Sequence, residues 1–536
     1  MIHCILHEDE HLLVVNKPAG LNTHAASLHG GEGIYDWLRN REPRWGSLSI
    51  IHRLDKDTSG VMVCGKTPLA NRSLTDQFTA RQTRKRYLLL TRGIRPPEPF
   101  TARSFIIRAG EKYVSRPGPP GEPAETFFTP AHDSPRISPS TGLHAWWAEP
   151  RTGRTHQIRL HAAANGLPIE GDPLYGSAPG ISSPQPGRLC LHATELHLTH
   201  PATGFPVCYS APADFTGSRH PLLRTALIDP AETDSFRLLH GAADDRPGLY
   251  VDHLGDFLLT QSEEPLPPEL GRQLMQQPGI RGLYHKTLLR RVRQTPMQQT
   301  CPVHVVGEPA PEKFSIRENA LQFELSFGEG YSVGLFLDQR DNRRRLLTGW
   351  VGPSFPALEL AGKQVLNTFS YTCGFSVCGA RAGAVTTSLD LSKKYLEWGR
   401  RNFALNGIPT EGHDFIFGDV FDWLRRFQKR QRQFDVVLLD PPTFSQSREA
   451  GVFQARNDYG RLLTAALGVL REGGLIFASN NTADWEPVSF LETLRLACGQ
   501  AGRRIRHEHY APQPPDFPVS RAEPAHLKTV WLRLAN

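Results

Sequence analysis

The stretch His52-Arg53-Leu54-Asp55-Lys56-Asp57-Thr58-Ser59-Gly60 is followed directly by the apolar run Val61-Met62-Val63-Cys64. The apolar run predicts a buried strand, and the Thr-Ser-Gly turn before it places Asp55 at the edge of a loop that this strand supports. Guanidinium groups near such a carboxylate keep it ionised, which suits a nucleophile or a general base. A structural Asp-Arg pair at a turn fits the same residues equally well. The role of Asp55 therefore depends on the rest of the chain.

Four further blocks accompany this stretch. Residues 9–21 predict a strand that ends in a Pro-Ala-Gly turn, and the other blocks are residues 84–87, 151–161 and 170–176. In this order the blocks resemble the signature motifs of the RluA-type pseudouridine synthases. The resemblance implies an α+β, mixed-sheet pseudouridine synthase domain over residues 1–215. It also implies isomerisation of uridine to pseudouridine without a cofactor.

The resemblance assigns roles to single residues. Asp55 is expected to be the catalytic aspartate, with Arg53 holding the uridine site open after the base has flipped out. Tyr87 is expected to pack on the base and to accept a proton from C5. Arg154 is the first expected partner of the Asp55 carboxylate, and Arg159 is the second. A carboxylate suits this reaction, because the base must leave the stack before the ribose is attacked or deprotonated. Three histidines are expected to be structural: His52, His156 and His161.

A second informative region is Phe434-Asp435-Val436-Val437-Leu438-Leu439-Asp440-Pro441-Pro442-Thr443-Phe444. It predicts a buried strand of the parallel type that ends in a loop with two prolines. Proline has no N–H, so Pro441 and Pro442 can present only carbonyl oxygens beside the Asp440 carboxylate. Such a wall suits a sulfonium methyl donor and the electron-poor edge of a base, on which Phe444 could stack. Taken alone, the tripeptide more often simply ends a strand.

Acidic residues at the ends of neighbouring strands indicate an open parallel sheet. Residues 363–374 predict a strand and a turn before a helix of small residues. Asp390 ends a strand about 20 residues later, and Asp419 ends a third. This order resembles a class I S-adenosylmethionine (SAM) methyltransferase and implies a doubly wound, Rossmann-like α/β domain over residues 319–536. The expected SAM contacts are Asn367, Phe369, Ser370, Tyr371, Gly374, Asp390, Asp419 and Asp440.

Residues 334–343 resemble the entry motif of the RlmI and RlmK groups of ribosomal RNA methyltransferases. RlmI-type enzymes make 5-methylcytosine with a cysteine nucleophile, whereas the matching place in this chain reads Ser479-Asn480-Asn481. The triplet and the Asp-Pro-Pro loop resemble the RlmK half of RlmKL, which forms 7-methylguanosine. Guanine N7 has a free lone pair, so alignment of donor and acceptor can suffice. The expected substrate contacts are Pro441, Pro442, Phe444, Asn480 and Arg340.

Two departures leave alternatives open. Residues 244–252 resemble the central domain of RlmI proteins, which implies a small α+β connector or RNA-binding domain over residues 216–318 and leaves the RNA target undecided. Cys373 stands where these families favour glycine, and no ligand pattern surrounds it, so no metal site is expected. The alternatives are 5-methylcytosine or N2-methylguanine as the methyl product. Another is that one half has lost its activity and acts only as an RNA-binding or assembly module.

Length and composition agree with a multidomain enzyme, since 536 residues exceed what a single core usually holds. The net charge of +7 includes basic clusters at residues 81–86 and 340–345, which adjoin the proposed sites and are expected to contact phosphates. Eight scattered cysteines and the absence of a signal peptide or apolar span predict a cytoplasmic protein without membrane contact. The expected partner is RNA, either 23S ribosomal RNA or a large-subunit assembly intermediate, and we expect one uridine and one guanine N7 to be modified.

Overall fold

The structure, a computed structural model, describes residues 2–92, 98–110, 112–131, 142–176, 188–215, 219–288, 300–447 and 451–535. The chain divides into two compact units. The first comprises Met1–His24, Gly33–Asp36 and Ser47–Leu227, and the second comprises Ala25–Glu32, Trp37–Gly46 and Ile228–Asn536. The domain boundaries proposed above at residues 215 and 318 stay predictions.

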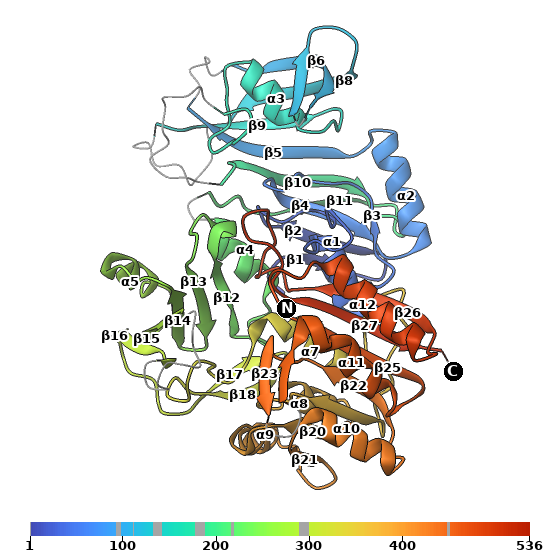
Figure 1. Cartoon of the computed structure of the whole chain (residues 1–536). Helices are drawn as coiled ribbons and strands as arrows, with labels where there is room; N and C mark the ends of the chain where they lie inside the picture. The colour runs from blue at the N-terminus through green and yellow to red at the C-terminus, as the bar shows by residue number, and fades with distance from the viewer. Residues whose placement is uncertain are drawn as a thin grey trace. The chain divides into compact units, whose positions relative to one another are not determined.

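The first unit is built on an 11-stranded mixed sheet (Figure 1). Its main path is β1-β2-β4-β10-β5-β9-β8-β6-β7, with β3 added to β4 and β11 added to β10. The pair β4 and β10 is parallel, whereas the other pairs are antiparallel. The strands are β1 (Ile5–Glu8), β2 (Leu12–Lys17), β3 (Ser49–Ile50), β4 (Ser59–Gly65), β5 (Arg84–Thr91), β6 (Phe100–Ala109), β7 (Lys112–Arg116), β8 (Glu122–Pro130), β9 (His144–Pro150), β10 (Leu191–Thr199) and β11 (Pro206–Ser210).

Local sequence explains the elements around the first predicted site. Every residue of β4 is buried, as the apolar run predicts, and α2 (Pro68–Thr79) packs on it through Leu74. Helix α2 begins where Thr67 accepts a hydrogen bond from the N–H of Ala70 and proline occupies the first turn. Gly60 has φ +121°, and a Cβ there would collide with the backbone of Ala193 on β10. Only glycine allows these two strands to approach so closely. The other helices of this unit are α3 (Gln157–Ala164) and α4 (Arg219–Leu227). Helix α1 (Ile34–Arg41) is divided between the two units after Asp36, and η1 (Pro43–Trp45) belongs to the second unit.

The second unit contains a five-stranded sheet of order β12-β13-β14-β15-β16, in which only β14 and β15 are parallel. A hairpin of β17 and β18 follows it. The elements are β12 (Ser235–His240), η3 (Gly241–Asp244), β13 (Tyr250–Leu254), β14 (Phe257–Ser262), α5 (Pro268–Leu274), β15 (Gly282–Thr287), β16 (Val303–Gly307), β17 (Phe314–Glu318) and β18 (Leu321–Leu325).

The second unit also contains a seven-stranded sheet of order β21-β20-β19-β22-β25-β27-β26. The first five strands are parallel, and β27 runs antiparallel to both of its neighbours, β25 and β26. The elements are η5 (Leu337–Gln339), α7 (Arg340–Thr348), β19 (Gln364–Thr368), α8 (Gly374–Arg381), β20 (Val385–Asp390), α9 (Lys393–Leu405), β21 (Asp414–Phe417), α10 (Val420–Lys429), β22 (Phe434–Leu439), β23 (Phe444–Ser447), β24 (Gly451–Gln454), α11 (Ala455–Leu467), β25 (Leu470–Asn480), α12 (Pro487–Gln500), β26 (Ile505–Pro512) and β27 (Lys528–Leu534).

Both faces of the seven-stranded sheet are buried. Val365 on β19 faces the core that includes α7, α8 and α9, whereas its neighbour Leu366 faces the core that includes α10, α11 and α12. Continuous apolar strands suit this arrangement, because alternate side chains serve the two helical layers. The predicted doubly wound α/β fold is confirmed. The strand order reverses between β19 and β22, and such a switch point places ligands at the carboxyl ends of the strands.

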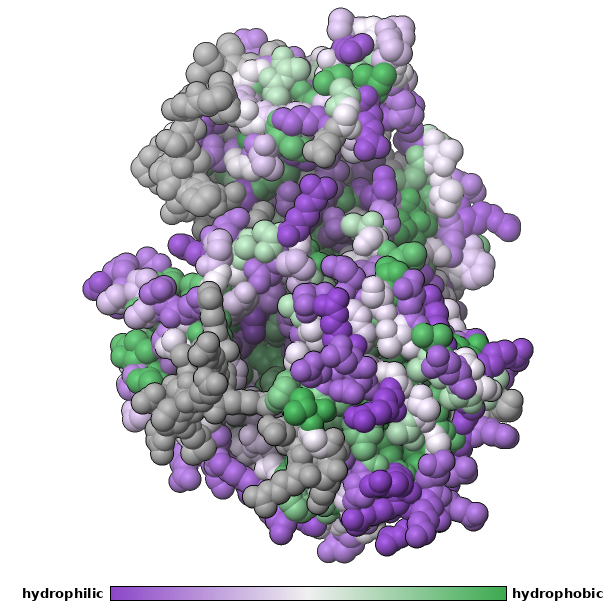
Figure 2. Space-filling view, viewed as in Figure 1, coloured by the Kyte–Doolittle hydropathy of each residue, from purple (hydrophilic) through white to green (hydrophobic). Residues whose placement is uncertain are grey.

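The surface in Figure 2 is hydrophilic over most of the visible face, with hydrophobic side chains in separate patches. Among the described residues, no helix is both long and apolar enough to cross a membrane.

Candidate active sites

The Asp55 carboxylate faces a guanidinium that the fold holds in place. Arg159 lies on α3 with only 4% of its side chain exposed, and its Nη1 is 3.6 Å from Asp55 Oδ2. Arg159 is fixed because its Nε and Nη2 donate to the two carboxylate oxygens of Asp172 at 2.8 and 2.7 Å. The Asp55 side chain is 28% exposed. A carboxylate that is accessible and lies beside a fixed positive charge is suited to act while ionised.

Tyr87 on β5 is buried beside this carboxylate. Burial, together with the negative charge of Asp55, raises the pKa of the Tyr87 phenol well above its ordinary value. The phenol therefore stays protonated, and it offers a ring and an O–H donor more readily than a proton acceptor.

The prediction that Arg154 is the first partner of the Asp55 carboxylate was wrong. Arg154 Nη1 donates to Glu122 at 3.0 Å, and its Nε donates to the Pro123 carbonyl at 3.3 Å. Helix α3 begins only at Gln157, so Arg154 precedes the helix and extends toward β8, whereas Arg159 lies on its buried side. Arg53 is exposed in the loop before Asp55, and its proposed role at the open uridine site stays a prediction.

His156 is closer to the site than the sequence indicated. Its Nε2 is 3.9 Å from Asp55 Oδ2, and its Nδ1 shares a hydrogen bond of 2.9 Å with the Tyr175 hydroxyl. Burial lowers the pKa of this imidazole, although Asp55 opposes that shift. A neutral ring can orient the carboxylate without adding charge. The only signal in the sequence was its position between Arg154 and Arg159 in one block. In the structure His156 has a positive φ of 56°, which makes a turn before α3.

Lys17 is a second residue that sequence reasoning missed. It is fully buried at the end of β2, and its Nζ donates to the carbonyls of Pro18, Leu21 and Lys56 at 2.9, 2.7 and 3.0 Å. Burial lowers its pKa to about 7, against the attraction of Asp57 and Asp55. Lys17 thus ties the Pro-Ala-Gly turn to the loop that carries Asp55.

In the second unit, a strained loop follows β19 at the switch point. Phe369, Tyr371 and Cys373 all have positive φ, at 53°, 48° and 63°, which costs about 1–3 kcal/mol each for residues other than glycine. Asp390 at the end of β20 holds this loop, because its carboxylate accepts from the N–H groups of Tyr371 at 2.9 Å and Ser392 at 2.8 Å. Burial raises the pKa of Asp390 to about 6.

Other predicted residues of this loop have supporting positions. Asn367 is buried on β19 and donates to the Ser376 hydroxyl on α8 at 2.9 Å, so it joins the two elements on either side of the loop. The backbone N–H of Ser370 donates a hydrogen bond to the Leu389 carbonyl at 3.0 Å. Gly374 begins α8, and a Cβ there would lie 3.0 Å from Leu335.

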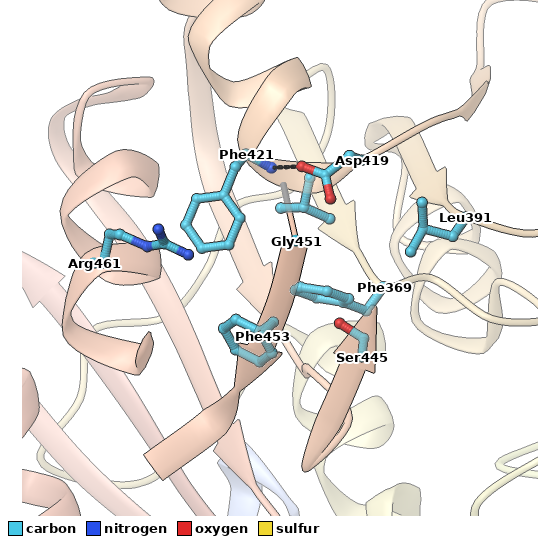
Figure 3. A pocket seen from close by; sticks show the side chains of 9 residues that line it. Phe369, Leu391, Asp419, Phe421, Ser445, Gly451, Phe453 and Arg461 are labelled. Atoms are coloured by element: carbon cyan, nitrogen blue, oxygen red, sulfur yellow. Dashed lines mark hydrogen bonds between the residues drawn. The ribbon is translucent and has the colours of Figure 1, made fainter. Parts of the chain in front are cut away.

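A shallow hollow opens beside this loop (Figure 3). Phe369, Phe421 and Phe453 line it, Arg461 lies against the Phe421 ring at 4.3 Å, and Asp419 lies at its edge. Asp419 also caps α10, since its Oδ1 accepts from the N–H groups of Phe421 and Asp422 at 2.9 and 3.1 Å. The hollow is therefore aromatic, with a carboxylate fixed at its edge.

Asp440 follows β22 and is bound to residues of two other segments. Its Oδ1 accepts from Gln339 Nε2 at 3.2 Å, and Gln339 also donates to the Ser479 hydroxyl at 2.8 Å. Burial, with a contribution from the charge of Asp338, raises the pKa of Asp440 to about 6. Asp338 itself pairs with His526 at 3.1 Å. Sequence reasoning missed Gln339, Ser479 and Asp338, because their hydrogen bonds join segments that are 101 to 188 residues apart.

The other residues predicted to contact the substrate differ in how far they are exposed. Pro441 is buried, Pro442 is exposed and Phe444 is half-buried on β23. Asn480 is 1% exposed; its Oδ1 accepts from the Thr482 N–H at 2.6 Å, while its Nδ2 has no partner among the described residues. Their contacts with a substrate stay predictions.

The predicted role of Arg340 in binding RNA was wrong. Arg340 is 3% exposed, and its two terminal nitrogens donate to Asp516 at 2.8 and 2.7 Å. The other arginines of residues 340–345 are also buried, Arg343 against Glu318 and Arg344 against Glu42. These guanidiniums already neutralise carboxylates from distant segments, so their charges are not available to pair with RNA phosphates. Within the described part of the chain, no cluster of three or more His, Cys, Asp or Glu side chains could hold a metal ion.

Residues 237–533, more than half of the chain, match the S-adenosylmethionine-dependent methyltransferase family. The chain belongs to this family. Residues 11–164 match RNA pseudouridylate synthase, so the first unit carries a pseudouridine synthase domain in front of the methyltransferase. The resemblance stated from the motifs is confirmed for both parts.

Relatives agree with the methyltransferase part. A ribosomal RNA large subunit methyltransferase of Deinococcus radiodurans is 34% identical over 322 residues, which cover 58% of this chain and 76% of that protein. A ribosomal RNA large subunit methyltransferase K of Neisseria meningitidis is 37% identical over 196 residues, but these span only 51% of its length and 36% of this chain. A SAM-dependent methyltransferase structure from Streptococcus mutans has a TM-score of 0.50 at 26% identity and covers 63% of this chain and 87% of its own.

The residues of the methyltransferase fit SAM. The aromatic hollow suits a purine ring, and the Asp419 carboxylate at its edge suits the amine of adenine. The Asp390 carboxylate uses one lone pair of each oxygen on backbone N–H groups and keeps further acceptor capacity for ribose hydroxyls. The strained loop after β19 brings the backbone to the carboxyl ends of the strands, where ligands of this fold bind.

Proposed function

We propose that this protein is a bifunctional RNA-modifying enzyme that acts on large-subunit ribosomal RNA. In this proposal the synthase domain isomerises one uridine to pseudouridine, and the methyltransferase methylates one guanine at N7. The Asp55–Arg159 pair beside Tyr87 is the observation that carries the first activity. The ribosomal RNA named for the Deinococcus and Neisseria relatives supports the choice of substrate.

The synthase chemistry is assigned to the charged pair. Arg159 lies beside Asp55 and would fix the position of the carboxylate that attacks or deprotonates the ribose of a flipped-out uridine. Tyr87 supplies the ring on which the base packs. His156 and Lys17 keep the two loops around Asp55 in place.

The methyltransferase residues fit attack by a ring nitrogen better than attack by C5 of cytosine. Bound SAM supplies the methyl group, and Phe369, Asp390 and Asp419 would hold it. Cytosine C5 methylation requires a cysteine thiolate, but burial raises the pKa of Cys373 and of Cys378 to about 12. Guanine N7 needs only alignment, which the Asp440-Pro441-Pro442 wall would provide.

A second candidate product is an exocyclic N-methyl base such as N2-methylguanine. The observation in its favour is the Asp440 carboxyl, whose raised pKa of about 6 suits a hydrogen-bond acceptor and proton acceptor for an amine. N7 has no proton to give, so it would use Asp440 only for alignment.

The chemical stability of the product distinguishes these candidates. N7 methylation places a fixed positive charge on guanine and makes the RNA cleave at that nucleotide under borohydride and aniline. Unmodified 23S rRNA transcript treated with the enzyme and SAM should therefore cleave at one guanosine. Methyl incorporation without cleavage would favour the exocyclic product, and a trapped complex with 5-fluorocytosine-containing RNA would show the cysteine mechanism. Mapping the ribosomal RNA of a deletion strain should reveal the same two missing modifications.

A further inference from the structure

One face of the five-stranded sheet changes character along its length. Residues two apart on a strand share a face, so Asp252 lies on the same side as Leu254, and Lys286 lies on the same side as Tyr284. Leu254 and Tyr284 belong to a hydrophobic core shared with the seven-stranded sheet. At the other end of this face, four neighbouring strands place polar side chains together. They are Arg237 on β12, Asp252 on β13, Gln261 on β14 and Lys286 on β15.

The charges in this polar group are unequally paired. Asp252 already accepts from Arg237 Nε at 2.5 Å and from Gln261 Nε2 at 2.6 Å. Lys286 is only 8% exposed, and within the described residues no carboxylate forms an ion pair with its ammonium group. Its Nζ donates to the Tyr331 carbonyl at 3.3 Å and lies 4.2 Å from the centre of the Tyr331 ring. The Asp252 carboxylate attracts the Lys286 charge but already pairs with Arg237. A buried cation without an ion pair of its own is costly unless an anion joins it.

The polar group continues toward the methyl-acceptor residues. Tyr331 belongs to the loop that leads into η5, where Asp338 and Gln339 lie beside Asp440. The charge of Arg237 contributes to the lowered pKa of Asp338, and Arg237 stacks on Phe517 at 4.5 Å. Charges thus interact stepwise across one unit. Arg237 acts on both Lys286 and Asp338, and Asp338 acts on Asp440.

We propose that Lys286 binds a backbone phosphate of the RNA close to the nucleotide that is methylated. This inference rests on the proposed function, because it assumes that the methyltransferase site receives RNA. Phosphate is the anion that RNA brings whatever its sequence, and a single ammonium group suits it as a point charge. Burial lowers the pKa of Lys286 to about 8, so a bound phosphate would raise that pKa and hold the lysine charged. The carboxylate of SAM is the other anion that could reach a cation here, and the test separates the two.

The test compares Lys286→Gln with Lys286→Arg and with Lys313→Gln, a matched control at an exposed lysine of the same region. The measured quantity is kcat/KM for methyl transfer from labelled SAM to unmodified 23S rRNA transcript at several KCl concentrations. Lys286→Gln should lower kcat/KM roughly tenfold, the usual order for a charged hydrogen bond. It should also reduce the slope of log(kcat/KM) against log[KCl] by about 0.7, as expected for one lost phosphate contact to a single strand. Lys286→Arg and Lys313→Gln should keep the slope of the wild type.

The other outcomes overturn the proposal. An unchanged slope in Lys286→Gln, or an equal loss in Lys286→Arg, would show that the lysine only packs. Weaker SAM binding by titration calorimetry in Lys286→Gln would show that the anion is the cofactor carboxylate. If Lys286→Gln does not fold, Lys286→Met, with an apolar side chain of similar length, takes its place in every measurement. Wild-type enzyme that methylates no ribosomal RNA would instead contradict the proposed function.

Discussion

At the residue scale, the synthase site depends on which arginine meets Asp55. The motif located Asp55 and Tyr87, but Arg154 and Arg159, two of the three arginines in residues 151–161, differ only in their position relative to the start of α3. That start depends on Thr152 and on the Arg154 N–H, which both bond the Gln157 side chain. The start of this helix is hard to predict from the sequence, because the residue before it, His156, adopts a positive φ that histidine rarely takes.

Replacing Arg159 and Arg154 separately tests this geometry. Arg159→Gln leaves Asp172 buried without its partner and removes the charge beside Asp55. We expect the free energy of unfolding to fall by about 3–5 kcal/mol and pseudouridine formation to be lost. Arg154→Gln removes only an ion pair with Glu122, whose side chain is 67% exposed, so its stability should change by less than about 1 kcal/mol. Denaturant titration and a pseudouridine assay give both quantities; equal effects of the two substitutions would contradict the assignment.

The raised pKa of Asp390 predicts how SAM binding depends on pH. Its carboxylate form, which we propose accepts hydrogen bonds from ribose hydroxyls, dominates above about pH 6. SAM affinity should therefore be full near pH 8 and decline as the pH falls through about 6, because protonation removes acceptor capacity. Asp390→Asn should bind SAM more weakly and lose this pH dependence. Titration calorimetry between pH 5 and 8 measures it, and a flat wild-type profile would remove Asp390 from the cofactor site.

At the scale of elements, short sequence signals predicted the ends of strands better than charge clusters predicted exposed basic surfaces. The acids Asp390 and Asp419 lie at the ends of β20 and β21, because strand ends are marked locally by apolar runs and caps. The arginines of α7 were misassigned because their partners, such as Asp516 and Glu318, are distant in sequence. A basic run on a helix looks the same whether it faces water or buried carboxylates.

Asp419 has two roles that two substitutions separate. Asp419→Asn keeps an oxygen for the N–H groups of Phe421 and Asp422, so α10 and the melting temperature should be unchanged while SAM affinity falls. Asp419→Ala removes the cap as well and should cost about 1 kcal/mol of stability. Thermal unfolding with and without SAM makes the comparison. Unchanged SAM affinity in both variants would show that Asp419 acts only as a cap.

At the scale of the whole molecule, the sequence predicted two enzymatic parts but not where their chain segments belong. Trp37–Gly46 lies among the residues expected to form the synthase domain, yet it belongs to the compact unit of the methyltransferase. There Trp37 Nε1 donates to Asp341 at 3.0 Å, and Glu42 pairs with Arg344. No motif marks such a contact, because both partners are ordinary charged and aromatic residues about 300 positions apart.

Glu42→Gln should accordingly destabilise the methyltransferase rather than the synthase. Arg344 is only 11% exposed on its side chain, so losing one carboxylate should cost about 1–3 kcal/mol. The affected unfolding transition is recognisable, because SAM binding raises its midpoint. Glu122→Gln is the matched control in the first unit. Calorimetry that shows the SAM-sensitive transition unmoved in Glu42→Gln would contradict the assignment of this segment.

The central claim is that one chain performs two separate modifications, and the most direct test uses two variants on one substrate. Unmodified 23S rRNA transcript is incubated with SAM and with wild-type enzyme, Asp55→Asn or Asp440→Ala, and both modifications are mapped on the same RNA. We predict that the wild type yields pseudouridine and a methylated guanosine, that Asp55→Asn yields only the methylated guanosine, and that Asp440→Ala yields only pseudouridine. Pseudouridine formed at a near-normal rate by Asp55→Asn, or methylation retained by Asp440→Ala, would contradict the account.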